Sequence, residues 1–176
     1  MPFTSPTSCM QRIIMGPIDP AVLFLSLTSP EITPAFFARC SFRCENPEQP
    51  NAPYALVVGG DYVLADGIIL EYEPPYTMLM TFAQHWYEEI NDPPGRVRFT
   101  VTERSPNCEF TIVHDGLTAG SRLNDDLDDA WLMVASGLKT LVEVARAMPL
   151  RQDEVEAVEA GASSPEPEPA SAAAGP

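Results

Sequence analysis

The spacing of apolar residues predicts different elements in successive parts of the chain. Residues 10–16, MQRIIMG, are rich in large apolar side chains and predict a first strand. Two short helices are expected over residues 20–28 and 30–38, because each stretch opens on a proline that follows a capping side chain. Pro34 lies within the second stretch, so that helix is expected to be short or kinked.

Apolar and polar positions alternate through the middle of the chain, as in strands that bury one face. Short links rich in glycine, proline and asparagine separate these strands, which favours an antiparallel meander. Asp115-Gly116 has the composition of a turn and is expected to end the last strand. The strands are predicted over residues 53–59, 61–73, 76–87, 96–103 and 108–115. The side chains expected to face inward on the last two are Val97, Phe99, Val101, Phe110, Ile112 and His114.

After Gly116 the apolar residues recur at alternating steps of four and three, which is the period of an α-helix with one apolar face. A helix of about 25 residues spans about 37 Å, long enough to lie across a whole sheet. Gly137 is unusual in its interior, and it indicates either a close backbone approach or space beside the helix. The apolar positions are Leu127, Trp131, Val134, Leu138, Leu141, Ala145 and Met148.

The length and composition predict one α+β domain with tails. The chain has 176 residues, of which 45% are apolar, enough for a single substantial core. We expect a flexible arm over residues 1–9, a folded domain over residues 10–150 and a largely disordered tail over residues 151–176. The tail is acidic and rich in proline and alanine, with few large apolar side chains to offset the entropy of ordering it.

The charge and cysteine content restrict the partners and the compartment. Acidic side chains outnumber basic ones by 25 to 10, which gives a formal charge of −15. Such a surface repels phosphate backbones and anionic lipids, so the sequence disfavours nucleic-acid partners and membrane attachment. No apolar run is long enough to span a membrane or is placed as a signal peptide. Four cysteines without a leader indicate reduced thiols in a cytoplasmic protein.

Three aspartates near the start of the long helix have the DDxxD spacing of magnesium-binding prenyl-diphosphate enzymes. Asp125, Asp126 and Asp129 lie in its first turns, whereas Lys139 and Arg146 lie toward its other end. This arrangement complements the helix dipole at both ends, which explains the aspartates without a metal. A diphosphate enzyme also needs a large helical cavity, and this sequence is rich in strands. We therefore predict neither a metal site nor a cofactor.

Other candidate chemistry is weak, and no catalytic residue is assigned. His114 and Asp115 are neighbours in a strand, so their side chains point to opposite faces and cannot readily act on one substrate. His114 is expected to be a hydrogen-bonded core histidine rather than a general base. Cys40 and Cys44 have a CxxxC spacing without further ligands nearby, which does not fit a zinc site.

A cavity between the sheet and the long helix is the candidate ligand site. Its polar group would be His114, and Trp131 is the first large side chain that the helix turns toward the sheet. A plain packed core would use the same residues, and the sequence favours neither alternative. The candidate ligand-binding residues are Met78, Met80, Phe82, Phe99, Phe110, His114, Trp131, Val134 and Leu138.

Four segments together resemble one protein family in their order and spacing: GIILEYEPPYTMLMTF, RVRFTVTE, IVHDGL and, after Trp131, GLKTLVE. They resemble the single-domain bacterial homologues of the activator of the 90-kDa heat-shock protein ATPase, within the START-like SRPBCC superfamily. The likeness covers residues 10–147. It implies a helix-grip (Bet v-type) fold, in which a curved antiparallel sheet wraps around a long C-terminal helix, with two short helices. Phe36-Phe37 stand where a tryptophan commonly closes the second of these.

The resemblance suggests three functions. The first is non-enzymatic binding of a small hydrophobic molecule between sheet and helix, in an accessory protein related to stress. The second is a polyketide cyclase or aromatase in which His114 or Tyr76 would handle protons. The third is activation of a chaperone ATPase, which ranks last because eukaryotic activators carry a further N-terminal domain that we do not expect before Met10. Either a monomer or a homodimer is compatible with the sequence.

Overall fold

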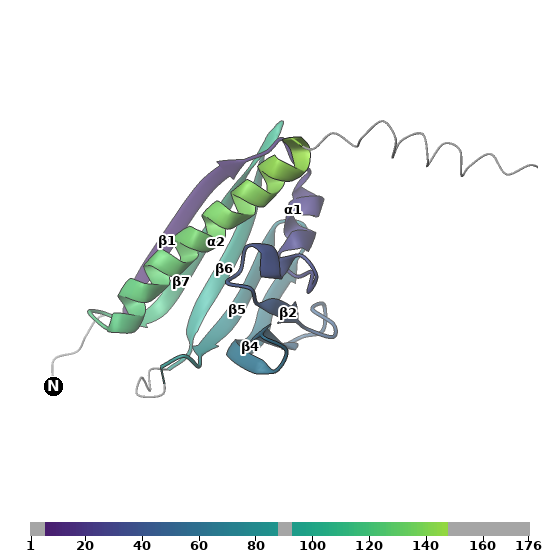
Figure 1. Cartoon of the computed structure of the whole chain (residues 1–176). Coiled ribbons are helices and arrows are strands. Elements are labelled where there is room, and N and C mark those ends of the chain that lie inside the picture. The colour runs from purple at the N-terminus through teal and green to yellow at the C-terminus, as the bar shows by residue number, and fades with distance from the viewer. Residues whose placement is uncertain (1–5, 88–92, 148–176) are drawn as a thin grey trace, which may run out of the picture. The chain divides into compact units, whose positions relative to one another are not determined.

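A seven-stranded antiparallel sheet forms the body of the protein, and one long helix lies along it (Figure 1). The structure is a computed structural model that describes residues 6–87 and 93–147. Contacts group the chain up to Ala145 into one compact unit, to which the fold and the site described below belong. The elements are β1 Pro6–Met15, α1 Pro20–Ser26, η1 Thr33–Ala35, β2 Ser41–Arg43, β3 Pro53–Val58, β4 Tyr62–Glu73, β5 Thr77–Gln84, β6 Gly95–Arg104, β7 Asn107–Thr118 and α2 Arg122–Ala147.

The strand order is β1-β7-β6-β5-β4-β3-β2, so the first strand closes against the last and the remaining strands follow as a meander. Sequential antiparallel neighbours need only short links, which is why the turn-rich composition predicted this part correctly. Helix α2 packs its apolar stripe on the sheet and buries Leu127, Trp131, Val134 and Leu138. The structure thus confirms the α+β helix-grip fold.

The start of α2 confirms the interpretation of its aspartates as a helix beginning. The Ser121 side chain accepts a hydrogen bond from the backbone N–H of Asn124 at 3.2 Å, as a capping residue does. Asp125 lies in the first turn, where a negative charge stabilises the exposed N–H groups. Toward the other end, Lys139 pairs with Glu143 and donates to the backbone oxygen of Ile14, 2.9 Å away.

The predicted second helix is largely absent, which corrects the expectation of two short α-helices. Only the 3₁₀ turn η1 forms there, with Pro34 at its centre. Its Thr33 side chain is fully buried, donates to the backbone oxygen of Ser29 and accepts from the N–H of Phe42, both at 3.0 Å. The chain then reverses into β2 through Ala38, whose φ is +48°, outside the helical region. A side chain that bonds its surroundings thus competes successfully with the helix.

The first strand is longer than predicted and a short strand was missed. Strand β1 begins at Pro6 rather than Met10 and pairs with β7 from Thr118 onward, so residues 6–9 of the predicted arm belong to the sheet. Its outward residues include Met10 and Ile14, which are apolar but exposed on an edge strand. The alternation of apolar and polar residues that marks a strand is therefore hard to recognise here. Strand β2 has three residues, too few to show a period. The remaining arm, residues 1–5, and the predicted tail, residues 151–176, lie outside the described residues.

The expected turn at Asp115-Gly116 is wrong, because β7 continues through it to Thr118. The pairing with β1 shifts by one residue here: Ser8 lies opposite Asp115 and Thr7 lies opposite Leu117. Gly116, with a φ of +82°, is the extra residue of a β-bulge, a conformation that glycine adopts without a steric penalty. The bulge leaves both His114 and Leu117 buried, although they are three residues apart.

Candidate functional site

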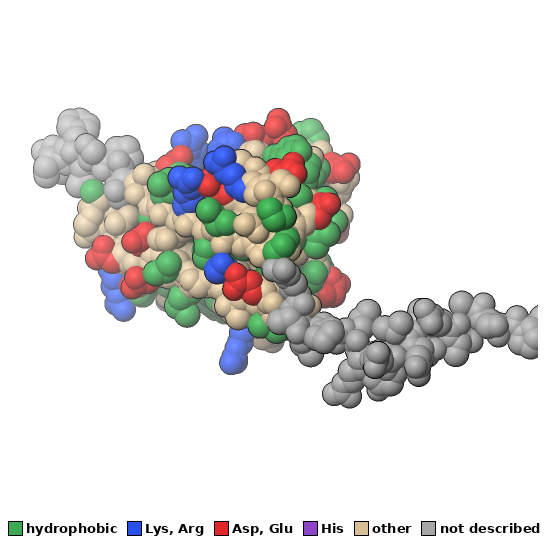
Figure 2. All heavy atoms as spheres, turned by 90° about the horizontal axis from the view of Figure 1, so that it is seen from above, with side chains coloured by type: hydrophobic (Ala, Val, Ile, Leu, Met, Phe, Trp, Pro, Cys, Tyr) green, Lys and Arg blue, Asp and Glu red, His purple; other side chains and the backbone are tan. Residues whose placement is uncertain are grey.

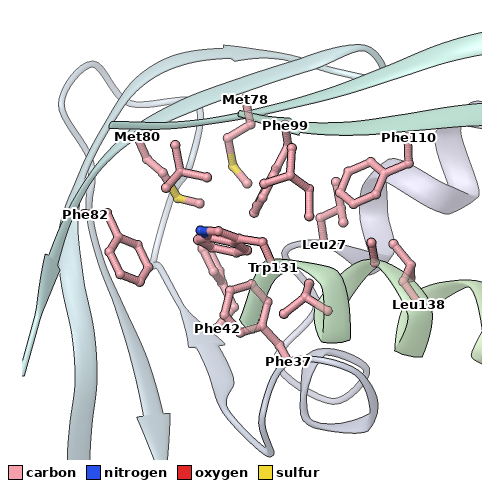
Figure 3. Close-up of a cluster of buried hydrophobic side chains, with 14 of the residues drawn as sticks. Leu27, Phe37, Phe42, Met78, Met80, Phe82, Phe99, Phe110, Trp131 and Leu138 are labelled. Atoms are coloured by element: carbon pink, nitrogen blue, oxygen red, sulfur yellow. The ribbon is translucent and has the colours of Figure 1, made fainter. Parts of the chain in front are cut away.

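Aromatic side chains from three parts of the chain surround Trp131 in the middle of the core (Figure 3). Its ring centroid lies 5.5 Å from that of Phe37, 5.6 Å from Phe82 and 5.9 Å from Phe99, all in edge-to-face geometry. Such contacts are worth about 0.5–1.5 kcal/mol each beyond the burial of apolar area. Phe37, which stands near the family's usual tryptophan position, therefore belongs to the packing of Trp131.

The nine predicted ligand-binding residues are all 5% exposed or less. Two of them, Phe82 and His114, line a pocket at one end of the sheet. The other seven lie in the packed core, and their role as ligand contacts stays a prediction. These seven are Met78, Met80, Phe99, Phe110, Trp131, Val134 and Leu138.

Gly137 serves a close backbone approach, which resolves the two alternatives raised by the sequence. A β-carbon at this position would lie 3.3 Å from Cα and from Cβ of Phe36. This distance is shorter than an ordinary van der Waals contact. Gly137 therefore lets α2 pack against the segment after η1 and leaves no ligand space there.

The pocket has a volume of about 310 Å³ and forms where β5 ends and β6 and α2 begin. We call it the His114 pocket. One wall is apolar and combines Phe82 with leucines from β7 and α2, whereas Gln84, His85 and Tyr87 bring polar groups to the lining. Its described lining contains no lysine, arginine, aspartate or glutamate. The lining residues are Phe82, Ala83, Gln84, His85, Tyr87, Pro93, Pro94, Gly95, His114, Gly116, Leu117, Leu123 and Leu127.

His114 joins the aromatic core to this pocket through its two ring nitrogens. Its Nδ1 accepts a hydrogen bond from the indole Nε1–H of Trp131 at 3.0 Å. Because an indole nitrogen can only donate, the neutral imidazole must carry its proton on Nε2. Among the described residues Nε2 has no hydrogen-bond partner, although His114 is only 1% exposed. A buried donor without a partner costs about 1–3 kcal/mol.

Burial keeps His114 neutral at physiological pH. Desolvation lowers the pKa of its imidazole to about 4, and the nearby carboxylate of Asp115 opposes this shift. The Asp115 side chain itself lies on the other face of β7, where it accepts a hydrogen bond from Nε of Arg96 at 2.8 Å. The two neighbours thus point to opposite faces, as the strand period predicts, and do not form a dyad.

Gly95 lets the backbone of β6 approach the His114 ring closely. A β-carbon on Gly95 would lie 2.4 Å from Nε2 of His114 and 2.9 Å from the backbone oxygen of Asp115. Any other residue would therefore collide with the imidazole. Gly95 is the first residue of β6 and lies opposite Phe82 of β5 in the sheet.

The rim of the pocket is held by polar contacts between β5 and α2. The Gln84 amide accepts from the N–H of Tyr87 at 2.9 Å and donates to the oxygen of the same residue at 3.1 Å. The Tyr87 hydroxyl donates to the carboxylate of Asp126, and the guanidinium of Arg122 lies 4.7 Å from the ring centre. One aspartate of the DDxxD spacing therefore fixes the rim.

Most of the pocket could not be found by motif or alternation. Gly95 looks like part of a turn in the sequence, and Leu117 lies beyond the supposed Asp115-Gly116 turn. The exceptions are Phe82 and His114, which were predicted as site residues, and Leu127, whose place in the helical stripe predicts burial toward the sheet. The missing signal for Leu117 is the bulge, because a period of two assigns it to the outer face.

One family profile, described as "Activator of Hsp90 ATPase homolog 1-like protein", matches residues 17–143, which is most of the chain. The chain belongs to this family. The sequence-based resemblance is therefore confirmed for the family as a whole. A comparison with curated proteins finds no match.

Solved structures with the same fold include other proteins of this kind. CalU16 from Micromonospora echinospora has a TM-score of 0.58 at 18% identity, over 88% of this chain and 86% of that one. The Aha1 dimer from Colwellia psychrerythraea has a TM-score of 0.62 at 13% identity, over 78% and 97%. PFC0360w, an HSP90 activator from Plasmodium falciparum, has a TM-score of 0.59 at 15% identity, over 81% and 97%. At these identities the likeness establishes a shared fold.

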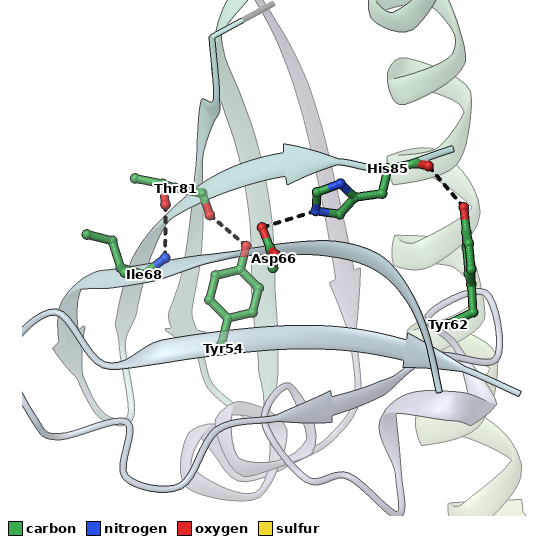
Figure 4. A network of polar contacts seen from close by, with 6 residues as sticks. All are labelled: Tyr54, Tyr62, Asp66, Ile68, Thr81 and His85. Atoms are coloured by element: carbon green, nitrogen blue, oxygen red, sulfur yellow. Dashed lines mark hydrogen bonds and ion pairs between the residues drawn. The ribbon is translucent and has the colours of Figure 1, made fainter. Parts of the chain in front are cut away.

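The second histidine of this family member lies in a surface network (Figure 4). Nε2 of His85 is 3.2 Å from Oδ1 of Asp66, and the Tyr62 hydroxyl donates to the backbone oxygen of His85 at 3.0 Å. Beside them the buried Tyr54 hydroxyl donates to the backbone oxygen of Thr81 at 2.6 Å. Both side chains of the His85–Asp66 pair are more than 40% exposed. These bonds tie β3, β4 and β5 together beside the pocket.

The four cysteines are all described and all free. Burial raises the pKa of each thiol, to about 11 for Cys9, so they are poor nucleophiles at neutral pH. Across residues 6–87 and 93–147, no group of three or more histidine, cysteine or acidic side chains is arranged to hold a metal ion. Within the same residues, no helix is both long and apolar enough to cross a bilayer.

Basic and acidic side chains are mixed on the face shown in Figure 2. On the outer face of the sheet, Glu109 accepts from Arg12 at 2.5 Å and lies 3.5 Å from Arg104. The hydrogen bond from Arg12 holds the pKa of the Glu109 carboxyl below its usual value. A similar pair joins Arg98 and Glu71 at 3.0 Å. These arginines of the outer face are thus paired with acidic side chains.

Proposed function

We propose that the protein binds a small, largely apolar molecule in the His114 pocket without transforming it. The observation that most supports this is the combination of an apolar wall, made by Phe82, Leu117, Leu123 and Leu127, with one buried imidazole nitrogen that has no partner in the described structure. Ligand pockets commonly have volumes of about 300–1,000 Å³ and few polar groups. A volume of about 310 Å³ suits a compact ligand.

Native mass spectrometry of gently purified protein, followed by titration with fatty acids, sterols and aromatic polyketides, tests the proposal. Trp131 donates directly to His114, so its fluorescence is expected to respond to ligand. A Trp86→Phe background makes Trp131 the only tryptophan. Finding neither a bound species nor a change in fluorescence would count against ligand binding.

Two substitutions on α2 separate the pocket from the rest of the helix. Leu123→Phe enlarges a buried pocket residue and is expected to weaken binding about tenfold or more, because it fills ligand space. Leu132→Phe makes the same change at an exposed site outside the pocket and should leave affinity unchanged. Equal affinities of the two variants would place the ligand elsewhere.

Activation of a chaperone ATPase is the second candidate, and family membership is the observation that favours it. Under this proposal the protein is a stress-related accessory factor in the cytoplasm, a compartment that suits four free cysteines. Adding the protein to purified Hsp90 should then accelerate ATP hydrolysis. An unchanged rate over a range of concentrations would remove this candidate.

A cyclase or aromatase activity is less favoured. Tyr76 is half exposed and precedes β5, whereas Phe82 lies near the other end of that strand. Six residues of extended chain separate the two by about 20 Å. Tyr76 and His114 therefore cannot share one compact substrate. A turnover assay in which His114→Ala loses activity would revive this candidate.

A further inference from the structure

We propose that the ligand of the His114 pocket carries an uncharged acceptor oxygen, a carbonyl or a hydroxyl, that takes a hydrogen bond from the Nε2–H of His114. This inference rests on the proposed binding function and specifies the chemistry of its ligand. It makes His114 the residue that selects among apolar molecules of the same shape.

The direction of the hydrogen bond follows from Trp131. The indole N–H occupies Nδ1 at 3.0 Å, which leaves Nε2 as the protonated nitrogen of a neutral ring. Nε2 can therefore donate and cannot accept. A ligand whose only polar group is a donor would leave two donors facing each other.

The absence of charge on the ligand follows from the lining. The described lining of the pocket holds no lysine or arginine that could neutralise a carboxylate. His114 itself resists protonation because burial lowers the pKa of its imidazole, and the charge that acts on it is the carboxylate of Asp115. An anion placed here would lose its hydration without gaining a counter-charge.

The position of the acceptor follows from the lining of the pocket. His114 belongs to that lining, and Gly95, which packs against its imidazole, has no side chain to cover Nε2. A ligand oxygen that reaches Nε2–H would have its apolar body against Phe82, Leu123 and Leu127. Satisfying a buried donor is worth about a tenfold gain in affinity.

Three derivatives of naphthalene of nearly equal shape test the proposal on the unaltered protein: the methyl ketone, the isopropyl compound and the carboxylate. We expect calorimetry at neutral pH to show the ketone binding about tenfold more tightly than the isopropyl compound, with the carboxylate weaker than the ketone by a similar factor. Equal affinities for ketone and isopropyl compound, or the tightest binding by the carboxylate, would overturn the inference and leave small-molecule binding intact. If none of the three binds while a compound of the panel above does, the inference is rejected and the proposed function stands; if no compound of either set binds, both are rejected.

Nitrogen NMR provides a readout that a merely structural histidine would not move. The chain has only two histidines, so the imidazole signals of His114 and His85 can be told apart. The His114 ring should be the neutral Nε2–H form, and its Nε2 signal should shift on addition of ketone but not of the isopropyl compound. A proton on Nδ1, or equal shifts with both ligands, would contradict the proposal.

Variants give a further test through the ratio of affinities rather than through affinity itself. His114→Gln retains both an acceptor for Trp131 and a donor for the ligand, so it should keep part of the ketone preference. His114→Phe has no donor, so the ketone and isopropyl compound should bind within about twofold of each other. A tenfold ketone preference that survives in His114→Phe would show that another group selects the ligand.

Discussion

At the scale of single residues, His114 shows how one side chain can be both a core residue and a site residue. Its Nδ1 completes the hydrogen bonding of Trp131, and the residue also lines a pocket. The sequence-based prediction of a hydrogen-bonded core histidine is correct for the first nitrogen. The alternation of β7 predicted that His114 faces inward, but no pattern in the sequence identifies the indole as its partner, because Trp131 lies on another element.

The hydrogen bond between Trp131 and His114 should contribute measurably to stability. His114→Phe leaves the buried indole N–H without an acceptor, and we expect a loss of about 2 kcal/mol in the free energy of unfolding. Denaturation in urea measures this value. His85→Gln, at the more exposed histidine, is the control and should change stability by less than about 0.5 kcal/mol. A His114→Phe variant as stable as the wild type would mean that the indole finds another acceptor.

Acid should destabilise the protein through the same residue. The pKa of His114 is about 4 in the folded state against 6.5 for the ordinary imidazole, so the unfolded chain takes up the proton first. Stability should therefore fall by about 3 kcal/mol as pH decreases from 6.5 to 4, and this contribution should level off below that range. The ionised Glu109 adds a loss in the same direction as pH falls through its lowered pKa.

Urea denaturation of wild type and His114→Gln at several pH values isolates the histidine effect. The variant has no imidazole at this position, so its stability should change less between pH 6.5 and pH 4. Parallel pH profiles of the two proteins would show that His114 does not titrate in this range.

At the scale of elements, the start of α2 is attached to the end of β5 through Tyr87. Its hydroxyl donates to Asp126, while Arg122 lies over its ring. The pair Arg122–Asp126 is also close along the helix, at 3.8 Å. The rim of the pocket therefore depends on a contact between two elements that are far apart in the sequence. This contact gives Asp126, one member of the acidic cluster, a structural role.

Asp126→Asn should loosen this attachment. We expect a loss of about 1 kcal/mol, because a partly exposed charge-assisted hydrogen bond becomes a neutral one. Asp129→Asn changes a neighbouring exposed aspartate and is the matched control, expected within about 0.5 kcal/mol of wild type. Thermal unfolding with and without magnesium completes the experiment. A rise in Tm with magnesium that Asp129→Asn abolishes would restore the metal interpretation.

Elements whose apolar pattern repeats over many residues were predictable from the sequence, whereas elements fixed by single tertiary contacts were not. The stripe of α2 and the meander follow from repeated spacings that many residues share. The segment around Thr33 follows from one buried hydroxyl that bonds two backbone groups, which overrides two favourable helix signals. Strand β1 gains its first residues only by pairing with β7, which is more than 100 residues away in the sequence.

At the scale of the whole molecule, the described fold needs only the residues up to the end of α2. That helix ends at Ala147, and the core draws on it as far as Val142. A chain ending at Leu150 should therefore unfold cooperatively with a Tm within about 2 °C of the full chain, because no described core residue is removed. Differential scanning calorimetry measures both. A fall in Tm of many degrees would show that residues 151–176 support the domain.

The candidate site was predictable in kind but not in place. The sequence suggests an apolar space between sheet and helix with His114 as its polar group, and the structure fills most of that space with side chains. What remains open lies at one end, where Gly95, Leu117 and Leu123 contribute. Where space remains open depends on how densely the side chains pack, and this depends on the volumes of residues brought together from the whole chain.

The extra residue in β7 has a consequence for the comparison of relatives. Gly116 puts three steps between the buried wall residues His114 and Leu117, and the bulge absorbs the extra step, so that both side chains stay on the same face. A relative with the same number of residues here but a regular strand would turn the equivalent of Leu117 to solvent and lose that side of the pocket, whereas a relative without the extra residue would keep it inward. The residue at position 116 is therefore the feature to inspect before a ligand is transferred from one family member to another.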